Sequence, residues 1–249
     1  NEDEGQNFIV DEEVIKKEIE SAELKNEDVV LEIGAGFGTL TREIAKISKV
    51  IAVEKDFRLF SYLIDKFETD ERIMLINDDF LDIIPPKFNK LVSNPPYNII
   101  DRILYKLNKY DFELGVMIMP KTVSDKLISE NIDSKFILIE KTFFSFQKIM
   151  DVKNDAFYPM RRVTSVMVKF YRNKPSLAQY VLLKDEMTTK NAIIRSLWDN
   201  FKKTKKESRA DADNIIEKYN IKFEDKAVGN LNLNEMKILI NALNDYKTN

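Results

Sequence analysis

Short apolar runs alternate with segments of helical periodicity over the first half of the chain. The short runs are nearly continuous in apolar residues, which is typical of strands buried on both faces of a sheet. They lie at 29–33, 50–53, 73–76, 90–94 and 114–119. Apolar residues recur every three or four positions, as on one face of a helix, at 12–22, 40–47, 57–67, 98–107 and 121–128. This alternation predicts a parallel sheet with helices on both faces.

The pattern changes in the second half of the chain. Residues 143–150 and 164–171 both look extended, and we expect an antiparallel pair that closes one edge of the sheet. Beyond Lys174-Pro175 the sequence is polar and helical, with helices expected at 192–201, 210–219 and 233–243. We therefore predict an α/β fold of two domains. A mostly parallel sheet domain spans 1–174, and a small helical domain spans 175–249.

Composition narrows the chemistry that this chain can perform. The 249 residues are 44% hydrophobic, which is enough for a sizeable core. Cysteine and histidine are both absent, so disulfides, thiolate metal sites and imidazole bases are excluded, and we expect no metal. The net charge of -3 means that a nucleic-acid partner would need a local basic patch. The chain has no run of 18 apolar residues and no signal-peptide pattern at its start. We expect a cytoplasmic monomer.

A glycine-rich turn follows the first strong strand. Gly34, Gly36 and Gly38 let the backbone approach a ligand closely, and the next helix begins with free N–H groups. This pattern suits dinucleotides and S-adenosylmethionine alike. Glu32, two residues before the first glycine, favours S-adenosylmethionine. The alternative is a tight strand–helix turn that binds no ligand.

Acidic residues follow the next two strands. Glu54 stands about 20 residues beyond the glycine turn, where an acid suits hydrogen bonds to ribose hydroxyls, and Lys55 follows it. Asp78 and Asp79 follow the third strand, with Phe80 directly after them. We expect Asp79, with Asp78 as the competing choice, to accept from the adenine amine of the cofactor. The alternative is that either aspartate only caps a helix.

The sequence Ser-Asn-Pro-Pro-Tyr-Asn at 93–98 follows the fourth strand. An adenine amine is a poor nucleophile because its lone pair is delocalised, and two acceptors at its N–H groups favour a pyramidal nitrogen. The Asn94 side chain and the Pro95 carbonyl are suitable acceptors, since the prolines fix the carbonyl direction. Tyr97 can stack on the base. No histidine is needed, because the amine proton becomes acidic once the nitrogen carries a methyl group.

Two further segments suit a nucleic-acid substrate. Phe157, in Ala-Phe-Tyr-Pro at 156–159, can cover the other face of a flipped-out base, although packing in the core explains it almost as well. A basic run suits phosphate binding, with a solvated helix end as its alternative. Its cations are Lys202, Lys203, Lys205, Lys206 and Arg209.

In this order, the segments resemble the ribosomal RNA adenine N6,N6-dimethyltransferase family, the KsgA and Erm group with its archaeal and eukaryal relatives. The resemblance begins with Gly-Gln-Asn-Phe-Ile at 5–9 and ends near residue 165. It implies a Rossmann-like class I methyltransferase fold, S-adenosylmethionine as cofactor, and dimethylation of adenine N6 in small-subunit ribosomal RNA during ribosome biogenesis. By match, the cofactor residues include Gln6, Asn7, Phe8, Gly34, Glu54 and Asp79. We also expect their neighbours in these motifs to contact the cofactor: Glu32, Gly36, Gly38, Lys55, Phe80 and Asn94. The target-base residues are Asn94, Tyr97 and Phe157.

The sequence departs from the family pattern at several positions. Pro95 replaces the usual leucine or isoleucine, Arg161 stands where a second proline is usual, and Lys141 falls near a usual glutamine. Two other functions therefore stay open. One is a ribosome-assembly or nucleic-acid-binding factor in which catalysis is lost or secondary, against which the intact 94–97 sequence argues. The other is an N6-adenine DNA methyltransferase, for which no DNA-recognition domain is evident.

Overall fold

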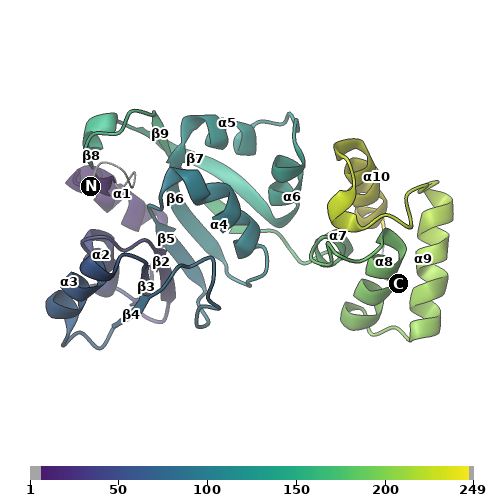
Figure 1. Cartoon of the computed structure of the whole chain (residues 1–249), viewed down its shortest axis with the longest axis horizontal. Helices are drawn as coiled ribbons and strands as arrows, with labels where there is room; N and C mark the ends of the chain where they lie inside the picture. Colours follow the sequence, from purple (N-terminus) through teal and green to yellow (C-terminus); the bar gives the residue numbers. More distant parts are fainter. Residues whose placement is uncertain (1–6, 247–249) are drawn as a thin grey trace. The chain divides into compact units, whose positions relative to one another are not determined.

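The structure, a computed structural model, describes residues 7–246. These residues form two compact units (Figure 1). The first comprises 7–130 and 144–172, and the second comprises 131–143 and 173–246. The chain thus leaves the first unit, contributes one helix to the second, and returns before it crosses finally at 172–173.

The first unit is built on a seven-stranded sheet in the order β4-β3-β2-β5-β6-β9-β7. The neighbours from β4 to β6 are parallel, whereas β9 is antiparallel to both β6 and β7, as the pattern predicted. The strands are β2 (Val29–Ile33), β3 (Lys49–Glu54), β4 (Ile73–Asn77), β5 (Lys90–Ser93), β6 (Leu114–Pro120), β7 (Phe144–Val152) and β9 (Ser165–Arg172). Strand order reverses between β2 and β5, and such a switch point opens a ligand crevice at the carboxyl ends of the strands.

Helices follow most of the parallel strands, and local sequence sets where they begin. Asp11 accepts from the N–H groups of Glu13 and Val14, and Asp56 accepts from Arg58, so that each aspartate caps its helix. The helices of this unit are α1 (Glu12–Ser21), α2 (Thr39–Ala45), α3 (Phe57–Phe67), α4 (Ile100–Leu107) and α5 (Lys121–Ile128). Short 3-10 turns, η2 (Tyr97–Ile99) and η3 (Asn154–Ala156), precede α4 and β8 (Phe157–Tyr158).

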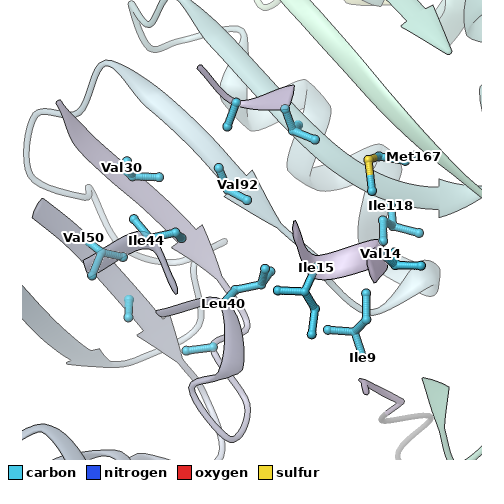
Figure 2. Packing of buried hydrophobic residues seen from close by; sticks show 14 of the residues in the cluster. Ile9, Val14, Ile15, Val30, Leu40, Ile44, Val50, Val92, Ile118 and Met167 are labelled. Carbon is cyan, nitrogen blue, oxygen red and sulfur yellow. The ribbon is translucent and has the colours of Figure 1, made fainter. Parts of the chain in front are cut away.

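One hydrophobic cluster joins α1 and α2 to one face of the sheet. Figure 2 shows Val30, Val50 and Val92 from three strands, with Ile15 of α1 and Ile44 of α2 in the same cluster. Each is almost fully buried, and burial of such a side chain contributes about 1.5–3 kcal/mol. Successive side chains of a strand point to opposite faces of the sheet. Packing of these residues against α1 and α2 therefore also sets the orientation of the residues at the carboxyl end of each strand.

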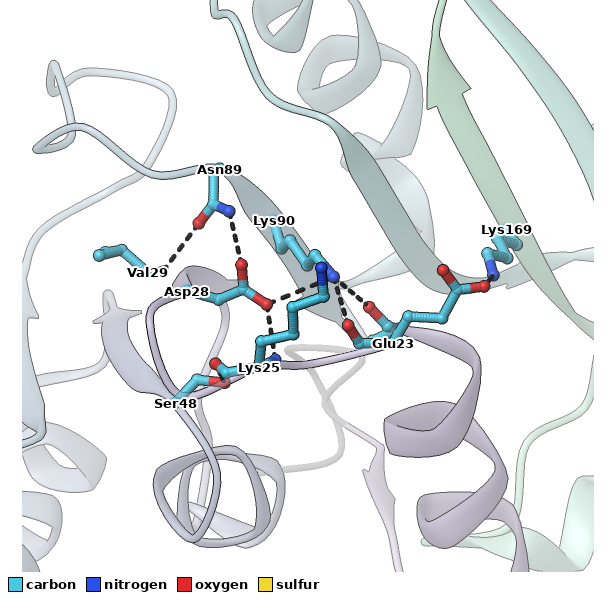
Figure 3. A network of polar contacts seen from close by, with 9 residues as sticks. Glu23, Lys25, Asp28, Val29, Ser48, Asn89, Lys90 and Lys169 are labelled. Atoms are coloured by element: carbon cyan, nitrogen blue, oxygen red, sulfur yellow. Dashed lines mark hydrogen bonds and ion pairs between the residues drawn. The ribbon is translucent and has the colours of Figure 1, made fainter.

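A polar network closes the opposite edge of the sheet, at the amino ends of β2 and β5 (Figure 3). The ammonium of Lys90 is buried, lies 3.3 Å from the Asp28 carboxylate, and donates to the carbonyls of Ala22 and Glu23. The Asn89 amide donates to Asp28 at 2.6 Å. Removal of one partner of such a buried ion pair costs about 3–5 kcal/mol, so this network ties the two central strands firmly together.

A second, two-stranded sheet pairs β1 (Phe8–Ile9) with β8, which the sequence did not predict. Two-residue strands give too short a pattern for periodicity to detect. The pairing brings Phe8 opposite Tyr158 and Ile9 opposite Phe157. It therefore unites the segment that begins the family resemblance with the segment that ends it.

The second unit is helical. Its elements are α6 (Lys135–Phe143), α7 (Leu177–Leu182), α8 (Thr189–Asn200), α9 (Lys205–Lys218), η4 (Val228–Asn230) and α10 (Leu233–Asn244). The sequence predicted α8, α9 and α10 but not α6 or α7. α9 begins five residues before the predicted start, because Thr204 and Glu207 form a capping box.

Helix α6 is the main difference from the predicted domain division after residue 174. Contacts assign 131–143 to the helical unit. Gln179 and Asn173 donate to carbonyls at the end of α6, to Thr142 at 2.9 Å and to Lys141 at 3.0 Å. The sequence could not indicate this, because an apolar helix between two strands has the same pattern whichever unit buries it.

Candidate functional site

The glycine turn is anchored to the neighbouring strand. The backbone N–H groups of Gly34 and Ala35 donate to the Val53 carbonyl, at 2.8 and 3.2 Å. Gly36 has φ +57°, and a β-carbon there would lie 2.9 Å from the Phe8 ring. Gly36 thus needs both a left-handed backbone and the absence of a side chain. Gly38, at φ +73°, is the N-cap residue of α2.

Glu54, the acid at the end of β3, fixes the turn from the other side. Its Oε2 accepts from the N–H of Gly36 at 2.8 Å, and its Oε1 accepts from the N–H of Asp56 at 2.8 Å. The side chain is only 6% exposed. Because each carboxylate oxygen can accept more than one hydrogen bond, Glu54 can still bind hydroxyl groups.

A cavity of about 520 Å³ opens beside this turn. Its lining includes most of the residues that the sequence predicted for cofactor binding: Asn7, Phe8, Gly34, Gly36, Glu54, Lys55, Asp79, Phe80 and Asn94. Glu32 and Gly38 do not line it, and Gln6 lies outside the described residues. Residues from six separate segments thus meet at the carboxyl edge of the sheet, where the strand order reverses.

Asp79 lies at the end of the cavity that β4 supplies. Its Oδ2 accepts from the Lys55 ammonium at 3.0 Å, and its Oδ1 accepts from the Leu81 N–H at 2.9 Å. Burial raises the pKa of Asp79, but these two donors outweigh it and hold the pKa below its usual value. Asp78 instead accepts from the N–H of Asp79 at 2.8 Å. Both aspartates line the cavity, with the ionised Asp79 held by its partners.

Glu32 lies beneath the turn instead of in the cavity wall. It is 1% exposed, and the Thr41 hydroxyl donates to its Oε2 at 2.5 Å. Burial raises the pKa of Glu32 to about 8. Glu32 therefore links the end of β2 to the first turn of α2, on either side of the glycines.

The 93–98 segment is held at the end of β5. The Ser93 hydroxyl donates to the Ile33 carbonyl at 2.7 Å, which joins β5 to the start of the glycine turn. The Asn94 amide nitrogen donates to Oε2 of Glu18, on α1, at 3.0 Å. The Asn94 amide oxygen is buried and has no hydrogen-bond partner within residues 7–246. Asn94 is thus a residue of the cavity lining whose amide keeps an unused acceptor.

Tyr97 and Phe157 face a common neighbour. The Arg161 guanidinium lies 3.6 Å from the Tyr97 ring centroid and 4.1 Å from that of Phe157. The Tyr97 hydroxyl donates to Ser165 at 2.6 Å, which fixes its ring. Phe157 is 2% exposed and belongs to the hydrophobic cluster. The two predicted stacking residues therefore flank a buried arginine, and that arginine lines the cavity.

Several residues of the site were not predicted from the sequence, and three of them carry charge close to the predicted groups. Arg102 and Arg161 line the cavity, and Glu18 bonds Asn94. Glu18 left a signal, because it is an acid four residues after Val14 on the apolar face of a helix. Arg161 was recognised only as a departure from the family pattern, and Arg102 had no distinguishing signal.

The predicted basic segment begins α9 in the second unit. Lys202, Lys205, Lys206 and Arg209 are exposed. Lys203 is half-buried, and its ammonium lies 2.9 Å from the Asp211 carboxylate. Hydrogen bonds that the Lys203 ammonium makes to Asp211 and Tyr246 raise the pKa of Lys203 to about 12. Four of the five predicted cations are therefore open to solvent.

Neither a metal site nor a membrane helix is found in the part of the chain that the structure describes. No group of three or more acidic side chains there is placed to hold a metal ion. No helix among the same residues has the length and apolar character needed to cross a membrane.

Comparison with known proteins places this site in context. A sequence model described as "Ribosomal RNA adenine dimethylase" matches residues 1–235. The chain is 34% identical over 221 residues to a probable ribosomal RNA small subunit methyltransferase A of Thermococcus sibiricus, covering 87% of this chain and 77% of that protein. It is 32% identical over 228 residues to ribosomal RNA small subunit methyltransferase A of Malacoplasma penetrans, covering 85% and 83%.

Two solved structures share the fold. One is a dimethyladenosine transferase from Plasmodium falciparum, with TM-score 0.65 and 22% identity, covering 95% of this chain and 97% of that one. The other is the 23S rRNA methyltransferase ErmE, with TM-score 0.64 and 22% identity, covering 96% and 100%. These likenesses confirm the predicted Rossmann-like methyltransferase architecture.

The geometry of Glu54 predicts the effect of its replacement on S-adenosylmethionine binding. Glu54→Ala should lose one or two charge-assisted hydrogen bonds to the ribose, at roughly 1.5–3 kcal/mol each, and loosen the Gly36 turn. Calorimetric titration should show affinity at least about ten-fold weaker, with Glu54→Gln intermediate. Thermal melting of both variants controls for folding. Wild-type affinity in a folded Glu54→Ala protein would contradict the role of this carboxylate.

Proposed function

The chain belongs to the ribosomal RNA adenine dimethylase family, whose methyl donor is S-adenosylmethionine, and we propose that it methylates the N6 amine of an adenine in small-subunit ribosomal RNA. The transfer of two methyl groups to that amine, by a monomer acting on a precursor of the subunit, is part of the proposal. One observation carries it above all. Asn94, just after β5, is one of the residues that line the cavity beside Glu54 and the glycine turn, and its buried amide oxygen has no hydrogen-bond partner among the described residues.

The cavity residues fit S-adenosylmethionine. Glu54 keeps acceptor capacity for ribose hydroxyls, and Asp79 is ionised and ready to accept from an adenine amine. The turn at Gly36 has no side chain to obstruct a ligand, and the buried Phe80 lines the cavity beside Asp79. When bound, S-adenosylmethionine supplies an electrophilic methyl group. Glu32 holds the glycine turn through its bond to Thr41, and we do not propose a contact between Glu32 and S-adenosylmethionine.

The protein's own contribution to the reaction is to hold the amine. The Asn94 oxygen and the Pro95 carbonyl accept the two N–H groups of adenine N6, which directs the nitrogen lone pair toward the methyl group. Their hydrogen bonds strengthen as positive charge develops on the nitrogen, so they stabilise the transition state more than the bound substrate. Once the N–CH₃ bond forms, the cationic nitrogen releases its proton, and no strong base is needed.

The Arg161 guanidinium lies over the rings of both Tyr97 and Phe157, which are the rings of the proposed base site. An adenine that stacks on these rings has to displace the guanidinium, which is planar like a base and is held by cation–π attraction. A guanidinium displaced in this way can pair with an RNA phosphate. Arg161 thus links entry of the base to binding of the strand that carries it.

The basic segment supports an RNA partner. Lys205 and Lys206 lie in the first turn of α9, where the helix dipole disfavours cations. Their presence does not stabilise this helix, which the capping box of Thr204 and Glu207 already begins. Exposed cations at a helix start suit phosphate groups. The small subunit is favoured as the source of the RNA because two relatives that match most of this chain are named for it.

Replacement of Asn94 tests the proposed chemistry. Asn94→Ala should keep its melting temperature, because the hydrogen bond of its side chain within the described residues is to a side chain of α1, and its cofactor affinity is measured separately because Asn94 lines the cavity. It should lose about 10²–10³ in the rate of methyl transfer, by analogy with the loss of one preorganised donor in an oxyanion hole. Single-turnover methylation of saturating small-subunit particles measures this. A wild-type rate would show that Asn94 does not act on the adenine amine. No methyl transfer by the folded, cofactor-bound wild-type protein would favour the assembly-factor alternative, in which the fold binds RNA without needing catalysis.

Replacement of Arg161 tests the base site. With the cofactor pocket saturated by S-adenosylhomocysteine, Arg161→Ala should bind free adenosine about 2- to 30-fold more tightly. This range corresponds to a lost cation–π attraction of about 0.5–2 kcal/mol. The nucleoside lacks phosphates, so no compensating contact is lost. Arg162→Ala, at the exposed neighbouring arginine, is the matched control and should bind adenosine as the wild type does. Equal affinities of the two variants would show that Arg161 does not occupy the base site.

Neutralising the exposed cations of the basic segment tests the RNA contact. Glutamine at Lys202, Lys205 and Lys206 should flatten the salt dependence of RNA binding by up to about 0.7–0.9 log units per lost phosphate contact. Cofactor affinity should not change. Lys203→Gln should have a smaller effect, because its ammonium already pairs with Asp211. An unchanged salt slope in the triple variant would make this segment an ordinary solvated helix start.

A further inference from the structure

Glu18 is a buried acid with no charged partner. It lies on α1, is 0% exposed, and belongs to the helix face that packs on the sheet with Val14 and Ile15. Within the described part of the chain no cation pairs with it, and its Oε1 has no hydrogen-bond partner. An apolar side chain at this position would cost less to bury. The presence of a glutamate at this position therefore calls for a role other than packing.

Among residues 7–246, the Glu18 side chain makes one hydrogen bond, and its partner belongs to the 93–98 segment. Its Oε2 accepts from the Asn94 amide nitrogen at 3.0 Å. An asparagine amide has a donor end and an acceptor end, and rotation by 180° exchanges them. The proposed chemistry needs the oxygen at the substrate amine, because an NH₂ group there would repel the N–H groups it is meant to accept. A carboxylate beside the Asn94 amide can only accept a hydrogen bond, so it favours the orientation in which the amide NH₂ group points toward the carboxylate.

We propose that Glu18 is a positioning residue for methyl transfer, which fixes the Asn94 amide with its nitrogen toward α1 and its oxygen toward the adenine amine. This rests on the proposed function of Asn94. The carboxylate also polarises the amide, since hydrogen bonds in a chain strengthen one another. Its negative charge favours the positive charge that develops on N6. Glu18 acts through Asn94 and does not touch the substrate.

The protonation state of Glu18 should control how well it performs this role. As a carboxylate it can only accept, so the amide has one orientation. As a neutral acid it can also donate, and the amide oxygen can turn toward it. Burial raises the pKa of Glu18 to about 8, and the bond from Asn94 only partly offsets this. The titratable groups that face it are Glu32 of β2 and Tyr97 of the 93–98 segment, both acids. The rate constant for methyl transfer should therefore rise with pH through about 8.

Two variants separate positioning from packing. Glu18→Leu fills the same space without an acceptor, and Glu18→Gln keeps an acceptor without the charge. Single-turnover rates are measured at saturating S-adenosylmethionine and small-subunit particles, across the pH range around 8. Glu140→Gln, at a buried glutamate of the helical unit, is the control for loss of a buried acid elsewhere. Cofactor affinity and melting temperature are measured for every variant.

Glu18→Leu should lose about 10- to 100-fold in the rate of methyl transfer, by analogy with the loss of a group that orients a metal ligand. Its cofactor affinity and KM for RNA should stay at wild-type values. Glu18→Gln should be intermediate and lose the rise with pH, which Glu140→Gln should retain. A folded Glu18→Leu protein with the wild-type rate, or a Glu18→Gln protein with the wild-type pH profile, would overturn the inference. Asn94→Ala distinguishes the two levels. If Asn94→Ala too is fully active, the proposed role of Asn94 fails along with that of Glu18, whereas if it is inactive, only the role of Glu18 fails.

Discussion

The hydrogen bond from the Gly36 N–H to the Glu54 carboxylate is the constraint on which the site depends. It joins the turn after β2 to the end of β3, while Gly34 and Ala35 bond the Val53 carbonyl beside it. The Ser93 hydroxyl, at the end of β5, donates to the Ile33 carbonyl at the end of β2. Hydrogen bonds thus connect the carboxyl ends of β2, β3 and β5. These bonds hold the residues that surround the ligand crevice at the strand switch point. The hydrophobic cluster and the Lys90 network hold the strands that these loops terminate (Figures 2 and 3).

This frame places the proposed acceptor of the substrate amine next to the cofactor cavity. Asn94 follows a strand buried at every position, and its amide meets an acid from α1, a helix of the same hydrophobic cluster. The same segment carries Tyr97, whose ring is fixed by Ser165 at the start of β9. The site therefore draws on both the parallel part of the sheet and its antiparallel edge. Rigid elements supply each of these groups, which suits a reaction that depends on orientation more than on a strong base.

Much of this arrangement could be predicted from the sequence, because its signals are local. Continuous apolar runs marked β2, β3, β5 and β6, and the glycines and acids that follow them are now found around one cavity. Tertiary contacts decided the rest. α6 looks like any apolar helix, and only its bonds to Asn173 and Gln179 assign it to the helical unit. Glu18 and Arg161 matter because of what lies opposite them, 76 residues away for Glu18 and Asn94. The spacing of residues along the chain does not indicate which distant residues form such pairs.

The central claim is that this cavity serves transfer of methyl groups to adenine N6 in small-subunit RNA. The most direct test incubates the protein with S-adenosylmethionine and small-subunit particles that lack this modification, digests the RNA to nucleosides, and identifies the products by mass spectrometry. We expect N6,N6-dimethyladenosine, formed through the monomethyl nucleoside and absent when large-subunit RNA replaces the particles. Methylation at another adenine atom or another base, or no methylated nucleoside from a protein that binds the cofactor, would contradict it.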